Sequence, residues 1–156
     1  MGEKANVFEE LVEVLKQGFK EVVPFHKLLG TKIEFFPTGE VNIRLDMKED
    51  LIGNVISGNL HGGVIATILD MAGGMTVALR VLKEMKDSPI DELIERYRRS
   101  GTVDMRVDFL MPGRGKYFTA SADVLRTGKT VSVARMEMRD DQEHLIAAGT
   151  GTYIFA

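Results

Sequence analysis

Hydrophobic and polar residues follow two different periods along this chain, and the periods separate helices from strands. Near the N-terminus, helical spacing of apolar residues predicts an amphipathic helix through Val7, Leu11, Val14, Leu15, Phe19 and Val22. Pro24 is expected to end that helix. Strict alternation then predicts strands over residues 31–36 and 41–47, joined by a turn at Pro37-Thr38-Gly39.

A long apolar segment occupies the middle of the chain. Residues 48–60 have the composition of a loop, and a helix is expected from about His61 to Lys86. Asp70 is the one charged residue between Gly62 and Leu79, so this helix has no polar face. A helix that is apolar all round is either buried in a core or spans a membrane. Its glycines and its carboxylate favour the buried position, and we expect no membrane insertion.

The second half of the chain predicts one short helix and four strands. Ser88 is the expected N-cap of the helix, with Pro89 at its first position, Asp91 three residues after the cap and Gly101 at its end. Strands are expected over residues 102–111, 117–126, 130–139 and 145–155, with turns at 112–115 and 127–128. Short turns between consecutive strands predict antiparallel hairpins. The whole order predicts an α+β fold, with one antiparallel sheet wrapped around the long buried helix.

Composition narrows the classes of protein that fit this pattern. The length of 156 residues suits a single domain over residues 1–156, and the net charge of −3 argues against nucleic acid as a partner. The chain has no cysteine, which excludes a disulfide scaffold, a thiolate zinc site and a cysteine nucleophile. Its histidines lack the spacing of metal ligands, so no metal is expected. No signal peptide is recognisable, and we expect a cytoplasmic protein.

Asp70 is the first candidate for chemistry. An ionised carboxylate in an apolar helix is costly unless it is paired or faces a cavity. Its neighbours one helical turn away are small: Ala66, Thr67, Gly73 and Gly74. These residues leave room for a ligand beside the carboxylate.

A second candidate lies where the same helix begins. The glycines of His61-Gly62-Gly63 expose backbone N–H groups, and the helix dipole favours negative charge there. Such N–H groups can stabilise an oxyanion. Gly62 and Asp70 are about 12 Å apart along one helix. If both serve one reaction, we expect them to come from two chains of a symmetric dimer.

The segment from Asn59 to Asp70 resembles the HGG…D motif of the PaaI-like branch of hotdog-fold thioesterases. The resemblance extends through residues 101–112 and 125–130. The inserted helix from Ser88 to Arg99 and the Met111-Pro112-Gly113-Arg114-Gly115 run make the chain similar to the YigI-type proteobacterial acyl-CoA thioesterases. The family implies a hotdog fold with an N-terminal helix and a short inserted helix.

The resemblance also implies roles for individual residues. Asp70 matches the catalytic carboxylate, which acts as nucleophile or as general base on water. Gly62 matches the oxyanion-hole amide, and His61 would orient its loop. Asn54 falls near the family's loop asparagine after a one-residue insertion, and Thr102 matches a residue that positions water. The implied substrate and CoA contacts are Gly63, Phe109, Met111, Pro112, Gly113, Arg114, Arg126, Gly128, Lys129 and Thr130.

Arg114, Lys116, Arg126 and Lys129 lie in or beside two turns, where they could pair with the phosphates of CoA. The implied reaction is hydrolysis of fatty acyl-CoA, of medium to long chain, by a homodimer or a dimer of dimers. It needs no cofactor other than the CoA of the substrate. Two alternatives stay open from the sequence. One is a hotdog enoyl-CoA hydratase that recruits His61, and the other is a non-catalytic acyl-CoA sensor.

Overall fold

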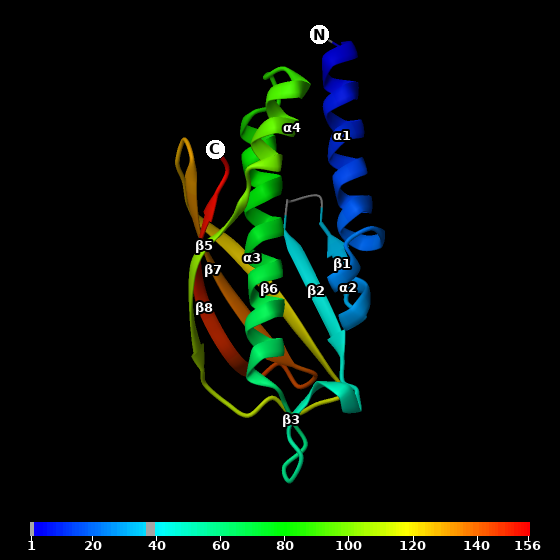
Figure 1. The fold of residues 1–156 in the computed structure, drawn as a ribbon, viewed down its shortest axis with the longest axis vertical. Helices are drawn as coiled ribbons and strands as arrows, with labels where there is room; N and C mark the ends of the chain where they lie inside the picture. Colours follow the sequence, from blue (N-terminus) through cyan, green and yellow to red (C-terminus); the bar gives the residue numbers. More distant parts are fainter. Residues whose placement is uncertain (1, 37–39) are drawn as a thin grey trace.

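The structure, a computed structural model, describes residues 2–36 and 40–156 (Figure 1). The turn predicted at 37–39 lies outside the described residues, as do the side chains of Val7 and Leu11. Six strands form one antiparallel sheet in the order β1-β2-β6-β7-β8-β5. Their bounds are β1 Lys32–Phe35, β2 Val41–Asp46, β5 Gly101–Phe109, β6 Tyr117–Thr127, β7 Val131–Asp140 and β8 Leu145–Ile154.

Helix α3 (Gly62–Glu84) lies against one face of this sheet and contacts β6 and β7 most extensively (Figure 1). Ile68, Leu69, Ala72 and Val77 on the helix are completely or almost completely buried. The helix has the length and composition of a membrane span, but most of that span is buried within the protein. This confirms the α+β fold with a long helix in the core.

The N-terminal helices differ in part from the prediction. Helix α1 spans Gly2–Glu21, and Pro24 begins a second helix, α2 (Pro24–Leu29), because proline fits the first helical position. Phe19 is buried as expected, whereas Val14 and Val22 are 67% and 68% exposed. Val14 is therefore exposed although its spacing predicts a place on the apolar face, and Val22 lies beyond the end of the helix.

The segment between α3 and β5 differs from the prediction at both ends of its helix, and Gly101, the predicted end, is the first residue of β5. Helix α4 spans Ile90–Arg98, and Pro89 rather than Ser88 takes the N-cap position, where no side chain caps the helix. Its first turn carries Asp91 and Glu92, whose negative charges interact favourably with the positive end of the helix dipole. Leu93 anchors the helix because its side chain is only 1% exposed.

The prediction that β5 and β6 form a hairpin is wrong. Strand β5 pairs with β8 at the edge of the sheet, and β6 lies between β2 and β7. Residues 110–116 therefore cross the end of the sheet, and Gly113 O accepts a hydrogen bond from Leu60 N on the way. The predicted loop at 48–60 contains a short 3₁₀ helix, η1 (Glu49–Leu51), and a small hairpin of β3 (Ile52–Asn54) and β4 (Asn59–Leu60).

Tyr153 on β8 holds α3 at a fixed distance from the sheet. Its side chain is almost fully buried, and its hydroxyl donates a hydrogen bond of 3.3 Å to the backbone oxygen of Asp70. A Cβ atom on Gly73 would lie 2.1 Å from this hydroxyl, and one on Gly151 would lie 2.7 Å from it. The hydroxyl therefore enters a slot that only glycine leaves open. Because Asp70 is one helical turn away, the slot also positions its carboxylate.

Two adjacent glycines of α3 allow a matched test of this slot. We expect Gly73→Ala to lower the free energy of unfolding by about 1–3 kcal/mol, because the methyl group collides with the buried tyrosine ring. We expect Gly74→Ala to raise it by up to about 1 kcal/mol, since its Cβ would meet Tyr153 at 3.5 Å and alanine favours the helix. Chemical denaturation of both variants measures the difference. Equal effects at the two positions would contradict the account.

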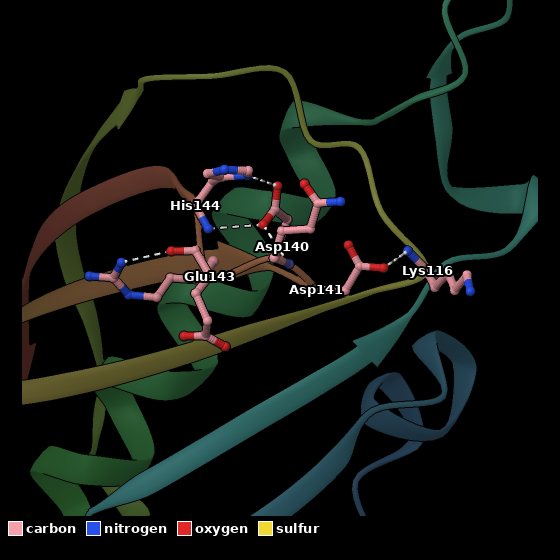
Figure 2. Close-up of polar contacts among 7 residues, drawn as sticks. Lys116, Asp140, Asp141, Glu143 and His144 are labelled. Carbon is pink, nitrogen blue, oxygen red and sulfur yellow. Dashed lines mark hydrogen bonds and ion pairs between the residues drawn. The ribbon is translucent and has the colours of Figure 1, made fainter.

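A network of polar groups organises the turn between β7 and β8 (Figure 2). Asp140 Oδ1 accepts hydrogen bonds of 2.9 Å from the backbone N–H groups of Gln142 and His144. The imidazole Nδ1 of His144 lies 3.1 Å from the other carboxylate oxygen of Asp140. Asp141 accepts a hydrogen bond from the backbone N–H of Lys116, which ties the turn to the start of β6 (Figure 2). Burial opposes ionisation of Asp140, but these hydrogen bonds outweigh it and lower the pKa of the carboxyl.

The lowered pKa predicts how stability depends on pH. A carboxylate whose pKa is lower in the folded state stabilises the fold above its ordinary pKa of 3.8, and the contribution is lost as pH falls through the folded value. We expect Asp140→Asn to lower the free energy of unfolding at pH 7 by about 1 kcal/mol. The difference from the wild type should shrink below about pH 4. Urea denaturation between pH 7 and 3 measures it, and a difference independent of pH would contradict the assignment.

Candidate active site

Asp70 lies on α3 beside the first residues of β5. Thr102 Oγ1 donates a hydrogen bond of 2.9 Å to Asp70 Oδ1, which orients the carboxylate. Behind it, the hydroxyl of Tyr153 bonds to the Asp70 backbone oxygen. Burial and the nearby Asp70 charge raise the pKa of Tyr153, so this tyrosine is a neutral hydrogen-bond donor at neutral pH. Asp70 and Thr102, which the sequence selects separately, are therefore in direct contact.

A cavity of about 260 Å³ opens beside the Asp70 carboxylate. It lies between α3, the α1–α2 corner, α4 and the ends of β5 and β8. Its lining is Phe19, Phe25, His26, Thr67, Asp70, Met71, Gly74, Met75, Ala78, Tyr97, Ser100, Gly101, Thr102, Tyr153 and Phe155. Most of these side chains are apolar, and Asp70 is the one carboxylate among them. The cavity thus combines one acidic group with room for an apolar ligand.

The N-terminus of α3 has the geometry of an anion site. His61 is the N-cap, and its Nδ1 accepts a hydrogen bond of 2.8 Å from the backbone N–H of Gly63. In the part of the chain that the structure describes, no acceptor bonds to the N–H of Gly62. The ring of Phe109 lies against Gly62, where a Cβ atom would be 3.4 Å away. A free, dipole-supported donor beside an aromatic ring can polarise a carbonyl oxygen.

The two asparagines near this helix end have different partners. Asn54 Oδ1 accepts hydrogen bonds from the backbone N–H groups of Ile56 and Ser57, at 3.0 and 3.2 Å. The asparagine that the resemblance places in the catalytic set therefore folds the β3–β4 turn in this structure, although it lines the same hollow as Gly62. Asn59, which sequence reasoning did not select, accepts a hydrogen bond of 2.8 Å from Arg114 Nε.

Within one chain, Gly62 and Asp70 face different hollows. The Gly62 hollow, of about 490 Å³, is lined by Gly53, Asn54, Asn59, Leu60, His61, Gly62, Ile65, Phe109, Leu110, Met111, Pro112 and Gly113. None of these residues lines the Asp70 cavity. On β5, Thr102 beside Asp70 and Phe109 beside Gly62 are separated by about 23 Å of extended strand. The Asp70 carboxylate and the Gly62 amide of one chain therefore lie in separate hollows.

The two turns that were predicted to contact CoA also lie at opposite ends of the chain's sheet. Met111, Pro112, Gly113 and Arg114 belong to the crossing segment at the Gly62 end (Figure 1). The hairpin that carries Arg126, Gly128, Lys129 and Thr130 projects from the opposite end of the sheet (Figure 1). It lies near the Asp70 end, because Thr102, Tyr153 and Ser132 are aligned across β5, β8 and β7. Gly63 is the second residue of α3, and its N–H is bonded to His61.

A third hollow lies beside the β7–β8 turn. It has a volume of about 530 Å³ and is lined by Met111, Pro112, Arg114, Gly115, Lys116, Asp140, Asp141, Gln142 and His144. Both of its carboxylates already have partners, since Asp140 bonds to His144 and Asp141 accepts from the backbone N–H of Lys116 (Figure 2). Among the described residues, no group of three or more His, Asp or Glu side chains is placed to hold a metal ion.

Sequence reasoning missed Tyr153 and the aromatic wall of the Asp70 cavity. The glycine pair Gly73-Gly74 was a signal for Tyr153, because adjacent glycines inside a buried helix indicate a close approach by another group. Phe19 and Tyr97 carried no such signal. Each fits the apolar face of its own helix, and only the tertiary structure brings their rings to 6.2 Å.

Comparison with known proteins agrees with this architecture. A model of the thioesterase superfamily matches residues 57–147. The chain is 36% identical over 146 residues to the medium/long-chain acyl-CoA thioesterases YigI of Salmonella typhimurium and Escherichia coli, with 94% of each chain covered.

Solved structures extend the comparison. A Shewanella oneidensis protein related to the thioesterase superfamily has a TM-score of 0.91 at 43% identity, covering 96% of this chain and 98% of that one. A Bacillus halodurans protein solved with CoA shares the fold, with a TM-score of 0.68 at 22% identity over 97% of this chain and 91% of that one. The free amide at one end of the central helix and the carboxylate within it thus belong to a hotdog protein, and the chain is a member of the thioesterase superfamily.

Proposed function

We propose that this chain is an acyl-CoA thioesterase that hydrolyses fatty acyl-CoA of medium to long chain to the free acid and CoA. The observation that carries the proposal is the Asp70 carboxylate, oriented by Thr102 at the edge of an apolar cavity. The activity named for the YigI relatives supports the same substrate class. Residues 1–156 form a single domain in this proposal, and location in the cytoplasm stays a prediction.

The reacting groups come from two copies of the chain. Strand β5 is an edge of the sheet, and its side chains Val103 and Phe109 are 59% and 57% exposed. The unpaired backbone groups of an edge strand can bond to another strand, although this edge also carries the exposed charges Asp104, Arg106 and Asp108. If β5 pairs antiparallel with β5 of a second copy, the start of one strand lies opposite the end of the other. Asp70 and Thr102 of one copy then face Gly62 and Phe109 of the other, which gives two composite sites in each dimer.

In this arrangement the Gly62 amide of one copy donates a hydrogen bond to the thioester oxygen, and Asp70 of the other copy drives the reaction. Either the carboxylate adds to the carbonyl carbon and expels CoA thiolate, leaving a mixed anhydride that water hydrolyses. Or the carboxylate takes a proton from a water near Thr102, the hydroxide adds, and collapse of the tetrahedral intermediate expels the thiolate. Incorporation of oxygen-18 into Asp70 during one turnover would separate these routes.

The remaining predicted residues have supporting roles. His61 bonds to Gly63 and so leaves the neighbouring Gly62 amide available. Asn54 shapes the loop beside that amide. Arg114 from one copy, with Arg126 and Lys129 from the other, would pair with the phosphates of CoA. The reaction uses no metal or redox cofactor, and assembly beyond a dimer is compatible with it.

The first test measures thiol release from a panel of acyl-CoA substrates. We expect Asp70→Asn to lower kcat at least about 100-fold, because the variant loses the nucleophile or base. Asp123→Asn on β6 is the matched control, since it removes a carboxylate that lies outside the Asp70 cavity, and we expect it to keep wild-type activity. Unchanged turnover by Asp70→Asn would show that Asp70 is not the catalytic group, and absence of thiol release by the wild type would favour a non-catalytic acyl-CoA binding module.

The second test asks whether one site uses two chains. Gly62→Pro removes the proposed oxyanion donor at the first helical position, where proline is tolerated, and His61 already has the extended conformation that proline requires before it. We expect the loss of one donor to lower kcat about 100- to 1,000-fold. Co-expression of Gly62→Pro with Asp70→Asn should restore about a quarter of wild-type activity, because half of the dimers are mixed and each holds one intact site.

Each variant co-expressed with a differently tagged copy of itself is the control and should stay inactive. Purification through both tags isolates the mixed dimers. Mixed dimers that form but show no recovered activity would contradict the two-chain site.

A further inference from the structure

The Asp70 cavity follows one face of α3 toward the C-terminal end of the helix. Its helical lining is Thr67, Asp70, Met71, Gly74, Met75 and Ala78. These positions are spaced by three and four residues, so they form one stripe along the helix. From Asp70 to Ala78 the stripe runs about 12 Å. It contains only small and flexible apolar side chains beyond the carboxylate, and Ala78 is the last of them.

The opposite wall is aromatic and held in place. Phe19 on α1 and Tyr97 on α4 both line the cavity, and their rings meet edge to face with centroids 6.2 Å apart. Arg96 fixes α4, because its Nε donates a hydrogen bond of 2.9 Å to the backbone oxygen of Phe155. His26 Nδ1 lies 2.9 Å from the backbone oxygen of Phe19, which joins α2 to α1.

We propose that this cavity is the acyl-tail site, and that Ala78 and the Phe19–Tyr97 pair set the chain length at which binding stops improving. The inference rests on the proposed thioesterase function. The carbonyl carbon lies at Asp70, and the tail runs along α3 toward Ala78. In the other direction the stripe ends at Thr67 after a single turn, and the hydroxyl of Thr67 is bonded to the Gly63 backbone oxygen. Only the direction toward Ala78 offers a long apolar path.

The dimensions of the cavity give the expected length. With C–C bonds of about 1.5 Å and angles near 111°, an extended alkyl chain advances about 1.25 Å per carbon, so 12 Å holds about ten carbons. Each methylene that becomes buried should raise kcat/KM about fourfold. We therefore expect kcat/KM to rise with chain length to about C10 and then to level off.

Ala78→Leu tests the far end of the site. The variant adds three carbon atoms to a side chain that lines the cavity, so they replace the last carbons of the tail. We expect the plateau to move about three carbons shorter, and kcat/KM for C10-CoA relative to C6-CoA to fall about 50-fold. Activity on the shortest substrates should stay near the wild-type value.

Ala122→Leu is the matched control. Ala122 on β6 is buried and lines a separate hollow of about 240 Å³ with Thr76, Leu79 and Arg80. The same side chain is added beside a hollow of similar size, but not beside Asp70. We expect its chain-length profile to match the wild type, and thermal denaturation of both variants shows whether they are folded.

Tyr97→Ala enlarges the cavity, whereas Ala78→Leu makes it smaller. It also adds no atoms to the core, so it does not carry the risk of overpacking. Loss of the ring opens the wall, and we expect the plateau to move to longer chains. If Ala78→Leu does not fold, this variant decides the question. A chain-length profile identical to the wild type in folded Ala78→Leu or in Tyr97→Ala would overturn the inference. Failure of the proposed function looks different, because the wild type would then release no CoA from any substrate.

Discussion

Burial of α3 along most of its length is the constraint on which the other features depend. The sheet covers one side of the helix, and α1, α2 and α4 approach the other side beside the Asp70 cavity. A charge on such a helix is unfavourable unless it is hydrogen-bonded and reaches a cavity. Asp70 meets both conditions through Thr102 and the adjacent space. A carboxylate at position 70 is therefore compatible with the buried helix because it lies at a cavity that can hold a ligand.

Two further contacts of α3 determine its rotation and leave a free amide at its N-terminus. Gly73 admits the Tyr153 hydroxyl, and this contact fixes the rotation of α3 at the turn that carries Asp70. At the N-terminus the His61 side chain accepts from the N–H of Gly63 and leaves the N–H of Gly62 free. Because both features lie on one straight helix, the carboxylate and the free amide stay apart. A reaction that needs both groups then requires two helices, which links activity to self-association.

Much of this arrangement could be predicted from the sequence because the signals are local. The apolar run predicts α3, the alternation at Val41, Ile43 and Leu45 predicts β2, and Asp70 stands out by its charge. The pairing of β5 with β8 could not be predicted from the short turn at 112–115, since it depends on contacts between residues 38 to 53 positions apart. Asn54 is a similar case, because an asparagine can serve a turn or a substrate, and only its partners distinguish the two. Strand order and aromatic pairing across helices are tertiary properties.

The central claim is that one thioester is held by two copies of the chain. A crystal structure of the Asp70→Asn variant with bound acyl-CoA would test it most directly. The account predicts a thioester oxygen about 3 Å from the Gly62 amide of one copy, with its carbonyl carbon beside residue 70 of the other. The acyl tail should lie along α3 toward Ala78. A thioester bound to Gly62 and residue 70 of the same copy, or bound away from both, would contradict the account.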